Sequence, residues 1–163
     1  MNKIISFVFL LMFSGIANAM WVTQSNENIF NEKKSLMLGQ LSGSSSVVAF
    51  DCEDGELSIS YLEDDKETDM DGMPMELMIK IDSNPIIKFS AITERRNSNS
   101  MGITSGDKNG IIKVLSQLRN ASSKFLVGVI ISGTDGKISR SGNVNGSTKA
   151  VNKFISDCGI KID

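Results

Sequence analysis

Alternating apolar and polar residues, separated by short turn segments, dominate the chain between residues 36 and 93. A two-residue period of this kind predicts half-buried β-strands. The segments with this pattern are 36–41, 47–52, 57–61, 76–81 and 86–93. Asp54-Gly55 separates the second segment from the third, and Asn84-Pro85 separates the last two, so we expect each of these pairs to form a hairpin.

The apolar period lengthens in the last third of the chain. Between Asp107 and Asn120 apolar residues recur every three or four positions, which predicts a helix with Asp107 or Ser105 as its N-cap. Strands are expected at 125–131 and 138–144, followed by a second helix over 147–158. The sequence therefore predicts an α+β protein, with a mostly antiparallel β-sheet or sandwich and two helices in its C-terminal half.

The first 19 residues have a different character. Lys3 precedes a run from Ile4 to Phe13 that is apolar except for Ser6, and the small residues of Ala17-Asn18-Ala19 follow. This order is typical of a secretory signal peptide, and the run is too short to span a bilayer. We therefore expect residues 1–19 to be a signal peptide and residues 20–163 to be one exported α+β domain. It should be periplasmic or extracellular, with no stable membrane insertion after cleavage.

Both cysteines of the chain lie in the exported part, Cys52 on a predicted strand and Cys158 in the last turn of a predicted helix. An even number of cysteines in an oxidising compartment is typical of disulfides. We expect one disulfide, which would join this helix to the sheet.

Composition narrows the range of functions. The 163 residues include no histidine, which excludes Ser-His-Asp and Cys-His catalysis and histidine-ligated zinc sites. Lys and Arg number 17 against 19 Asp and Glu, a formal net charge of -2, so no overall basic field attracts nucleic acid. We expect a protein without enzymatic activity or cofactor, which works by binding another protein in the periplasm.

Four residues are candidates for contact with such a partner. Trp21 is the only tryptophan and Tyr61 the only tyrosine, and residues of both types contribute to binding surfaces as well as to cores. Arg95 and Arg96 stand before the polar run 97–100, where they can present a small anion-binding or protein-binding site, or a solvated hairpin end.

A methionine series follows an acidic segment. Glu63 to Asp71 contains six carboxylates, Asp69 among them, and predicts a solvated loop. Four methionines accompany this segment. One lies within it and three follow it: Met70, then Met73, Met75 and Met78. Thioethers are soft ligands that select Cu(I), but methionine also fills irregular gaps in cores. These four residues are the candidates for metal binding, although Met75 and Met78 are expected on opposite faces of a strand.

The order of the segments resembles the VasI/TagO family of type VI secretion-associated periplasmic proteins. The residues that carry this resemblance are Trp21-Val22, the strand and acidic turn from Phe50 to Tyr61 around Cys52, Ile79–Asp82, Val114–Leu118, Gly142 or Gly146, and the closing Asp157-Cys158. The resemblance spreads over nearly all of residues 20–163. It implies a non-enzymatic accessory role in the assembly of a contractile secretion apparatus near the cell wall, and it supplies no catalytic residues.

The segment from Phe50 to Tyr61 is also similar to the first strands of periplasmic inhibitors of c-type lysozyme. This second resemblance implies a β-rich protein that plugs the cleft of a cell-wall enzyme. Secretion accessory, lysozyme inhibitor and Cu(I)-binding protein are thus the three functions that the sequence leaves open.

Overall fold

The protein folds into one antiparallel sheet of nine strands with two helices. The computed structural model describes residues 20–27, 33–43, 45–67 and 70–162. The predicted signal peptide and Asp69 of the acidic segment lie outside these residues. The elements are β1 (Trp21–Glu27), β2 (Lys33–Gln40), β3 (Val47–Glu53), β4 (Glu56–Asp64), β5 (Pro74–Ile81), β6 (Ile87–Asn97), β7 (Ser100–Ser105), α1 (Lys108–Arg119), β8 (Lys124–Ile131), β9 (Lys137–Asn143) and α2 (Ser147–Cys158).

The predicted fold class is confirmed, as are both predicted hairpins, β3–β4 and β5–β6. Two strands had not been predicted. β1 has only two apolar residues, Trp21 and Val22, before a polar run, and β7 has Gly102 near its centre. β1 forms by pairing with β2, and β7 forms by pairing with β6. Both neighbours have a clear strand pattern, and β-structure depends on tertiary context more than on local preference.

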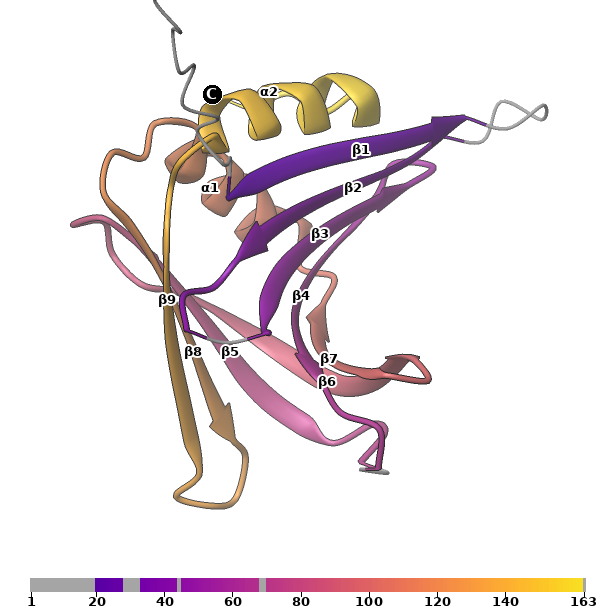
Figure 1. Ribbon diagram of the computed structural model, residues 1–163, viewed down its shortest axis with the longest axis vertical. Coiled ribbons are helices and arrows are strands. Elements are labelled where there is room, and N and C mark those ends of the chain that lie inside the picture. Colours follow the sequence, from indigo (N-terminus) through magenta and orange to yellow (C-terminus); the bar gives the residue numbers. More distant parts are fainter. Residues whose placement is uncertain (1–19, 28–32, 44, 68–69, 163) are drawn as a thin grey trace, which may run out of the picture.

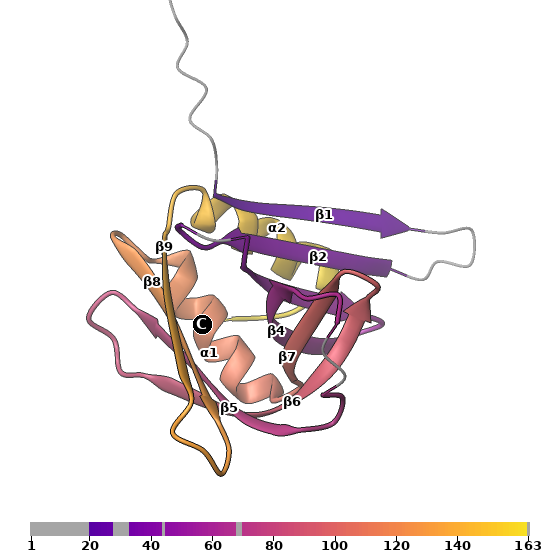
Figure 2. The ribbon, with the colours of Figure 1, turned by 60° about the horizontal axis from the view of Figure 1, so that its bottom comes forward.

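The sheet has the strand order β1-β2-β3-β4-β7-β6-β5-β8-β9 and curves around the helices. In Figure 1, α2 lies over β1 and β2. In Figure 2, α1 lies inside the curve formed by the remaining strands, packed on β4, β5, β6 and α2. We call the side that carries the helices the concave face. Alternate residues of each strand point to it, for example Leu77, Ile79 and Ile81 of β5, all of which are buried.

An aromatic cluster fills the concave face beneath α2. The Trp21 ring lies 5.0 Å from the Phe125 ring and 6.3 Å from the Phe50 ring, measured between centroids. Phe50 in turn meets Phe154 of α2 at 6.4 Å. Gly39 leaves the space that the Trp21 ring occupies, since a Cβ atom at residue 39 would lie 2.4 Å from the indole. This cluster and the apolar face of α1 form the main core.

The two edge strands approach each other at one corner of the molecule. The backbone N–H of Trp21 donates to the carbonyl of Asn145, just after β9, and the N–H of Ser42, just after β2, donates to the carbonyl of Ser141 in β9. Gly142 permits this approach, because a Cβ atom there would lie 2.9 Å from the carbonyl oxygen of Gln40. The curve is therefore tied at the corner and remains open along the rest of β1.

Both helices begin and end at the predicted residues within one position. Asp107 is the N-cap of α1, where its side chain accepts hydrogen bonds from the N–H groups of Asn109 and Gly110. In α2 the predicted apolar residues Ala150, Val151 and Phe154 are buried. Among the residues with described positions, no helix has the length and hydropathy needed to cross a membrane.

Candidate functional site

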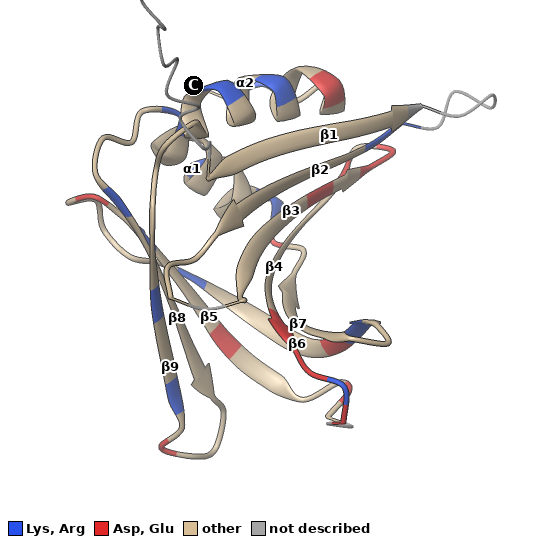
Figure 3. Ribbon diagram, in the orientation of Figure 1, with Lys and Arg blue, Asp and Glu red and all other residues tan. Residues whose placement is uncertain are grey.

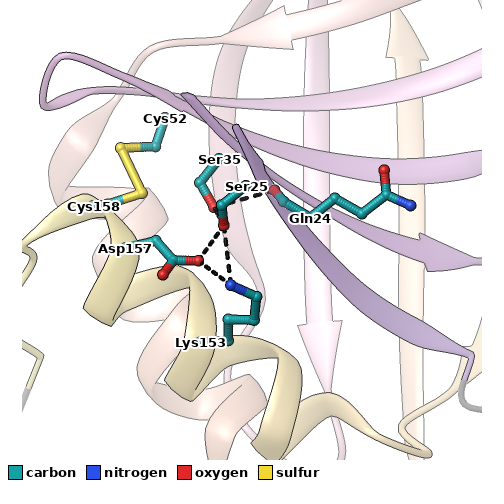
Figure 4. The surroundings of a disulfide bond; sticks show 7 residues. All are labelled: Gln24, Ser25, Ser35, Cys52, Lys153, Asp157 and Cys158. Atoms are coloured by element: carbon teal, nitrogen blue, oxygen red, sulfur yellow. Dashed lines mark hydrogen bonds and ion pairs between the residues drawn. A yellow bond between two sulfur atoms is a disulfide. The ribbon is translucent and has the colours of Figure 1, made fainter. Parts of the chain in front are cut away.

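A disulfide joins the sheet to α2. Cys52 of β3 and Cys158 at the end of α2 are 106 residues apart in sequence, and their Cα atoms lie 6.1 Å apart. Figure 4 shows a polar cluster beside this disulfide. Lys153 forms a 2.7 Å ion pair with Asp157, and the hydroxyl of Ser25 in β1 donates to the same carboxylate. Burial acts to raise the pKa of Asp157, but the hydrogen bonds from Lys153 and Ser25 outweigh it and hold the pKa below its usual value.

A cavity of about 90 Å³ opens at the end of the concave face that the helices do not cover. We call it the mouth cavity. Its lining residues point inward from six strands and from the segment between β4 and β5: Tyr61, Glu63, Asp65, Met70, Met75, Thr93, Met101, Ile103, Ile131 and Ile138. Most of these side chains are apolar, and three of the polar ones, Tyr61, Glu63 and Asp65, come from β4 and the segment directly after it.

The hydroxyl of Tyr61 connects the apolar and polar parts of the mouth cavity. It donates to the carboxylate of Glu63, and the hydroxyl of Ser46 lies 3.2 Å from the Tyr61 oxygen. Burial of the phenol, followed by the hydrogen bond to Glu63, raises the pKa of Tyr61 to about 12. Tyr61 is therefore neutral over the physiological range, and its hydroxyl is held by neighbours in its own chain.

Arg140 of β9 completes the polar side of this cavity. Its Nη2 atom lies 3.5 Å from Oε1 of Glu63, and both side chains are partly exposed. The Nε atom of Arg140 is buried and has no hydrogen-bond partner among the described residues. A buried donor without a partner costs free energy, so an acceptor on a bound molecule can improve this arrangement.

The segment before β5 closes one side of the mouth cavity. Thr93, which is 1% exposed, donates through its hydroxyl to the carbonyl of Met70 and accepts from the N–H of Met73 at 2.9 Å. The backbone N–H of Gly72 also donates to the carbonyl of Thr93. β6 therefore fixes the path of residues 70–73 and with it the position of the Met70 side chain.

The structure separates the methionine series. Met70 and Met75 line the mouth cavity, together with Met101, which the sequence had not suggested. Met73 is 37% exposed, and Met78 points to the opposite face of β5, against Gly128. Two of the four predicted methionines thus line the same cavity, together with Met101 of β7.

The other candidate residues have partners within the chain. Trp21 is 2% exposed, and its indole N–H donates to the carbonyl of Asn143 at 2.9 Å. Arg96 binds the carboxylate of Asp51 with both Nη atoms, and this hydrogen bonding raises its pKa. Arg95 donates to the carbonyl of Asp65, and its backbone N–H donates to Asp71. Both arginines therefore hold the β6–β7 hairpin against other parts of the chain.

Several residues of the mouth cavity were not predicted as site residues: Met101, Ile103, Ile131, Ile138 and the neighbouring Arg140. Glu63 was predicted in a solvated loop, whereas it lies in β4 and lines the cavity. Strand alternation carries a usable signal, since Ile131 and Ile138 have the same parity as the buried residues of their strands. What the sequence does not show is that six strands bring these positions to one end of one face.

Scans of protein-family models, of curated proteins and of solved structures each returned no match to this chain. The resemblance to the VasI/TagO family stays a prediction.

Proposed function

We propose that the protein is a non-enzymatic, exported binding protein whose mouth cavity receives one apolar side chain of a partner protein. The resemblance to the VasI/TagO family supports a partner in the type VI secretion apparatus. The mouth cavity is the single observation that supports binding. At about 90 Å³ it is well below the roughly 300–1,000 Å³ of sites for small-molecule ligands, and its size suits one side chain.

The composition of the mouth cavity fits a contact between proteins. Protein interfaces concentrate their energy in an apolar pocket near the centre, surrounded by polar groups that exclude water. Methionine and isoleucine side chains form the apolar part here, and Glu63 with Arg140 forms the polar border. Methionines also adapt to differently shaped partners, because their side chains are unbranched and polarizable.

Ile131→Phe tests this function. Ile131 lines the mouth cavity, so the larger ring would fill the space that the partner's side chain needs. Tagged residues 20–163 are used to capture partners from a periplasmic extract, the partner is identified by mass spectrometry, and its affinity is then measured with purified protein. We expect a secretion-apparatus protein whose affinity falls at least tenfold in Ile131→Phe.

The matched control is Ile130→Phe, the neighbouring residue of β8, which points to the opposite face. Affinity should be unchanged in this variant. Equal binding by wild type and Ile131→Phe would show that the mouth cavity is not the contact. Capture and inhibition of a muramidase would instead favour the lysozyme-inhibitor function.

A second function, Cu(I) binding, is favoured by the three methionines that line one cavity. Met70, Met75 and Met101 present thioethers to the same space, and thioethers select Cu(I) over harder metals. A competition titration against a chromophoric Cu(I) chelator should show at least tenfold weaker binding for Met75→Leu/Met101→Leu. Met73→Leu/Met78→Leu is the control, and equal affinities for the two double variants would contradict this function.

A further inference from the structure

The two edges of the sheet are protected to different degrees. Exposed strand edges invite pairing with other chains, and natural proteins discourage it with Lys, Pro, bulges or covering segments. The β9 edge carries Lys137 and Arg140, and Ser42 and Trp21 donate hydrogen bonds to its carbonyls. β1 contains no Lys, Arg or Pro over its seven residues. Among the backbone hydrogen bonds of the described residues, only that from the N–H of Trp21 to the carbonyl of Asn145 crosses the β1 edge.

The register of β1 against β2 identifies the backbone groups that face outward. Residue 22 pairs with residue 38, and the N–H of Gln40 donates to the carbonyl of Met20. In an antiparallel pair, alternate residues direct both backbone groups to the partner strand. Thr23 and Ser25 consequently direct theirs away from β2. None of the hydrogen bonds among the described residues outside the β1–β2 ladder reaches the backbone groups of these two residues.

A groove of about 330 Å³ runs beside this edge, between β1 and α2. Its lining residues are Trp21, Val22, Thr23, Gly146, Lys149, Ala150 and Lys153. Val22, on the outer side of the edge, is 43% exposed. Trp21 and Thr23 point to the concave side and Val22 points to the other, so the groove follows the edge itself.

The charges of this groove select its occupant. Among the described residues, the charged side chains that line it are Lys149 and Lys153, one helical turn apart on α2. Figure 3 shows basic residues on α2, which lies above β1. Lys153 is paired with Asp157, whereas Lys149 is exposed and forms no ion pair with any described residue. A segment carrying carboxylates would complement this lining.

We propose that the β1 edge binds an extended acidic segment of a partner protein, which adds to the sheet as a tenth strand beside α2. The backbone groups of Thr23 and Ser25 form the new ladder, in the manner of β-strand addition. Lys149 and Lys153 contact carboxylates of the incoming segment, and Val22 packs against an apolar side chain between them. This surface is separate from the mouth cavity, so it does not depend on the function proposed above.

The experiment selects binders from a displayed random ten-residue peptide library with purified residues 20–163. Selected peptides are synthesised, and their affinities are measured by the fluorescence of Trp21, the only tryptophan, which lines the groove. We expect selected sequences that alternate apolar and acidic residues. Hydrogen exchange at the amides of Thr23 and Ser25 should slow at least tenfold when they bind.

Two variant pairs separate the backbone and charge contributions. Thr23→Pro removes the outward N–H, while Thr23→Val removes only the hydroxyl that donates to Ala150. Lys149→Glu reverses the groove charge, and Lys113→Glu makes the same change at an exposed position of α1. Thr23→Pro and Lys149→Glu should weaken peptide binding at least tenfold. Thr23→Val, Lys113→Glu and the mouth variant Ile131→Phe should bind as wild type does.

Three results would overturn this assignment. Selected peptides without acidic residues would show that charge does not select the bound segment. Equal binding by Thr23→Pro and Thr23→Val would show that the segment does not pair with β1 as a strand. A wild-type dimer in sedimentation that Thr23→Pro converts to monomer would show that the edge pairs with a second copy, whose β1 offers Glu27 as its one carboxylate. If Thr23→Pro loses its fold, as shown by Trp21 emission, the Lys149→Glu and Lys113→Glu pair decides the outcome.

Discussion

The hydroxyl of Tyr61 lies between the carboxylate of Glu63 and the apolar lining of the mouth cavity. Burial and this hydrogen bond both favour the neutral phenol, which raises its pKa to about 12. Because Tyr61 is the only tyrosine, tyrosinate absorbance reports its ionisation directly. We expect the folded protein to titrate near pH 12, and the unfolded chain in denaturant to titrate near the ordinary value of about 10.

Glu63→Gln provides the control for this titration. It removes the negative charge and keeps the size of the side chain, so the pKa of Tyr61 should fall towards, but not reach, its ordinary value, since burial remains. The raised pKa also predicts that the Tyr61 contribution to stability is complete below pH 10 and is lost as pH rises towards 12. A wild-type titration near pH 10 would show that the phenol is exposed.

Asp82 fixes the β5–β6 turn against the segment that leads from α1 into β8. Its backbone φ is +50°, and its carboxylate accepts hydrogen bonds from the N–H groups of Ser122, Ser123 and Lys124. Hydrogen bonds from Lys124 and then Ser122 lower the pKa of Asp82 strongly. Asp82→Asn should reduce the free energy of unfolding at pH 7 by about 0.5–1.5 kcal/mol, because an amide replaces one acceptor oxygen with a donor and the site is open to solvent.

The pH dependence of this difference follows from the lowered pKa. The contribution of Asp82 is complete above its ordinary pKa of about 3.9 and is lost as pH falls through the folded-state pKa. Denaturant unfolding of wild type and Asp82→Asn at pH 7 and at pH 2.5 should therefore show the larger difference at pH 7. A constant difference would mean that the carboxylate charge does not contribute.

At the scale of elements, β1 packs on β2 by placing the large Trp21 side chain over Gly39. The indole of Trp21 covers Gly39, where a Cβ atom would lie 2.4 Å from the ring. Phe50 and Phe125 pack against the ring and limit the space into which it can shift. Gly39→Ala should therefore destabilise the protein by about 1–3 kcal/mol, measured by denaturant unfolding, and shift the emission of Trp21 to longer wavelength.

Gly106→Ala is the control for the same chemical change. At Gly106 a Cβ atom would meet only the carbonyl of Leu57, at the ordinary contact distance of 3.8 Å. This variant should retain wild-type stability within about 0.5 kcal/mol. Equal stability of Gly39→Ala and wild type would contradict close packing between β1 and β2.

For the whole molecule, the disulfide connects parts of the chain that lie far apart in sequence. It closes a loop of 106 residues between β3 and α2. Long loops gain most from a crosslink, because the unfolded chain loses more conformations. Cys158→Ser should lower the free energy of unfolding by about 2–5 kcal/mol, measured by denaturant unfolding without reductant.

The corresponding control uses Cys52→Ser and the double variant. If one crosslink accounts for the loss, all three variants should be destabilised by the same amount, since each removes the same bond. Additive losses, or no change in Cys158→Ser, would show that the two thiols act independently.

The sequence alone predicted most of the elements and their class. The apolar patterns predicted seven of the nine strands, helical spacing predicted both helices, and Asp54-Gly55 predicted the β3–β4 turn. These features are local, because a two-residue or 3.6-residue apolar period is set by backbone geometry. The positions of Cys52 and Cys158 likewise predicted the link between the helix and the sheet.

The candidate sites depended on tertiary structure. Met101 joins Met70 and Met75 only because β7 lies between β4 and β6, which no local pattern specifies. The same order leaves β1 at an edge, although its polar residues do not predict a strand. Long-range pairing determines both results, since it decides which ends of which strands meet and which backbone groups stay unpaired. The sequence by itself thus determined most of the elements of this protein through local apolar periods, while the tertiary structure decided the strands β1 and β7 and which surfaces are available for binding.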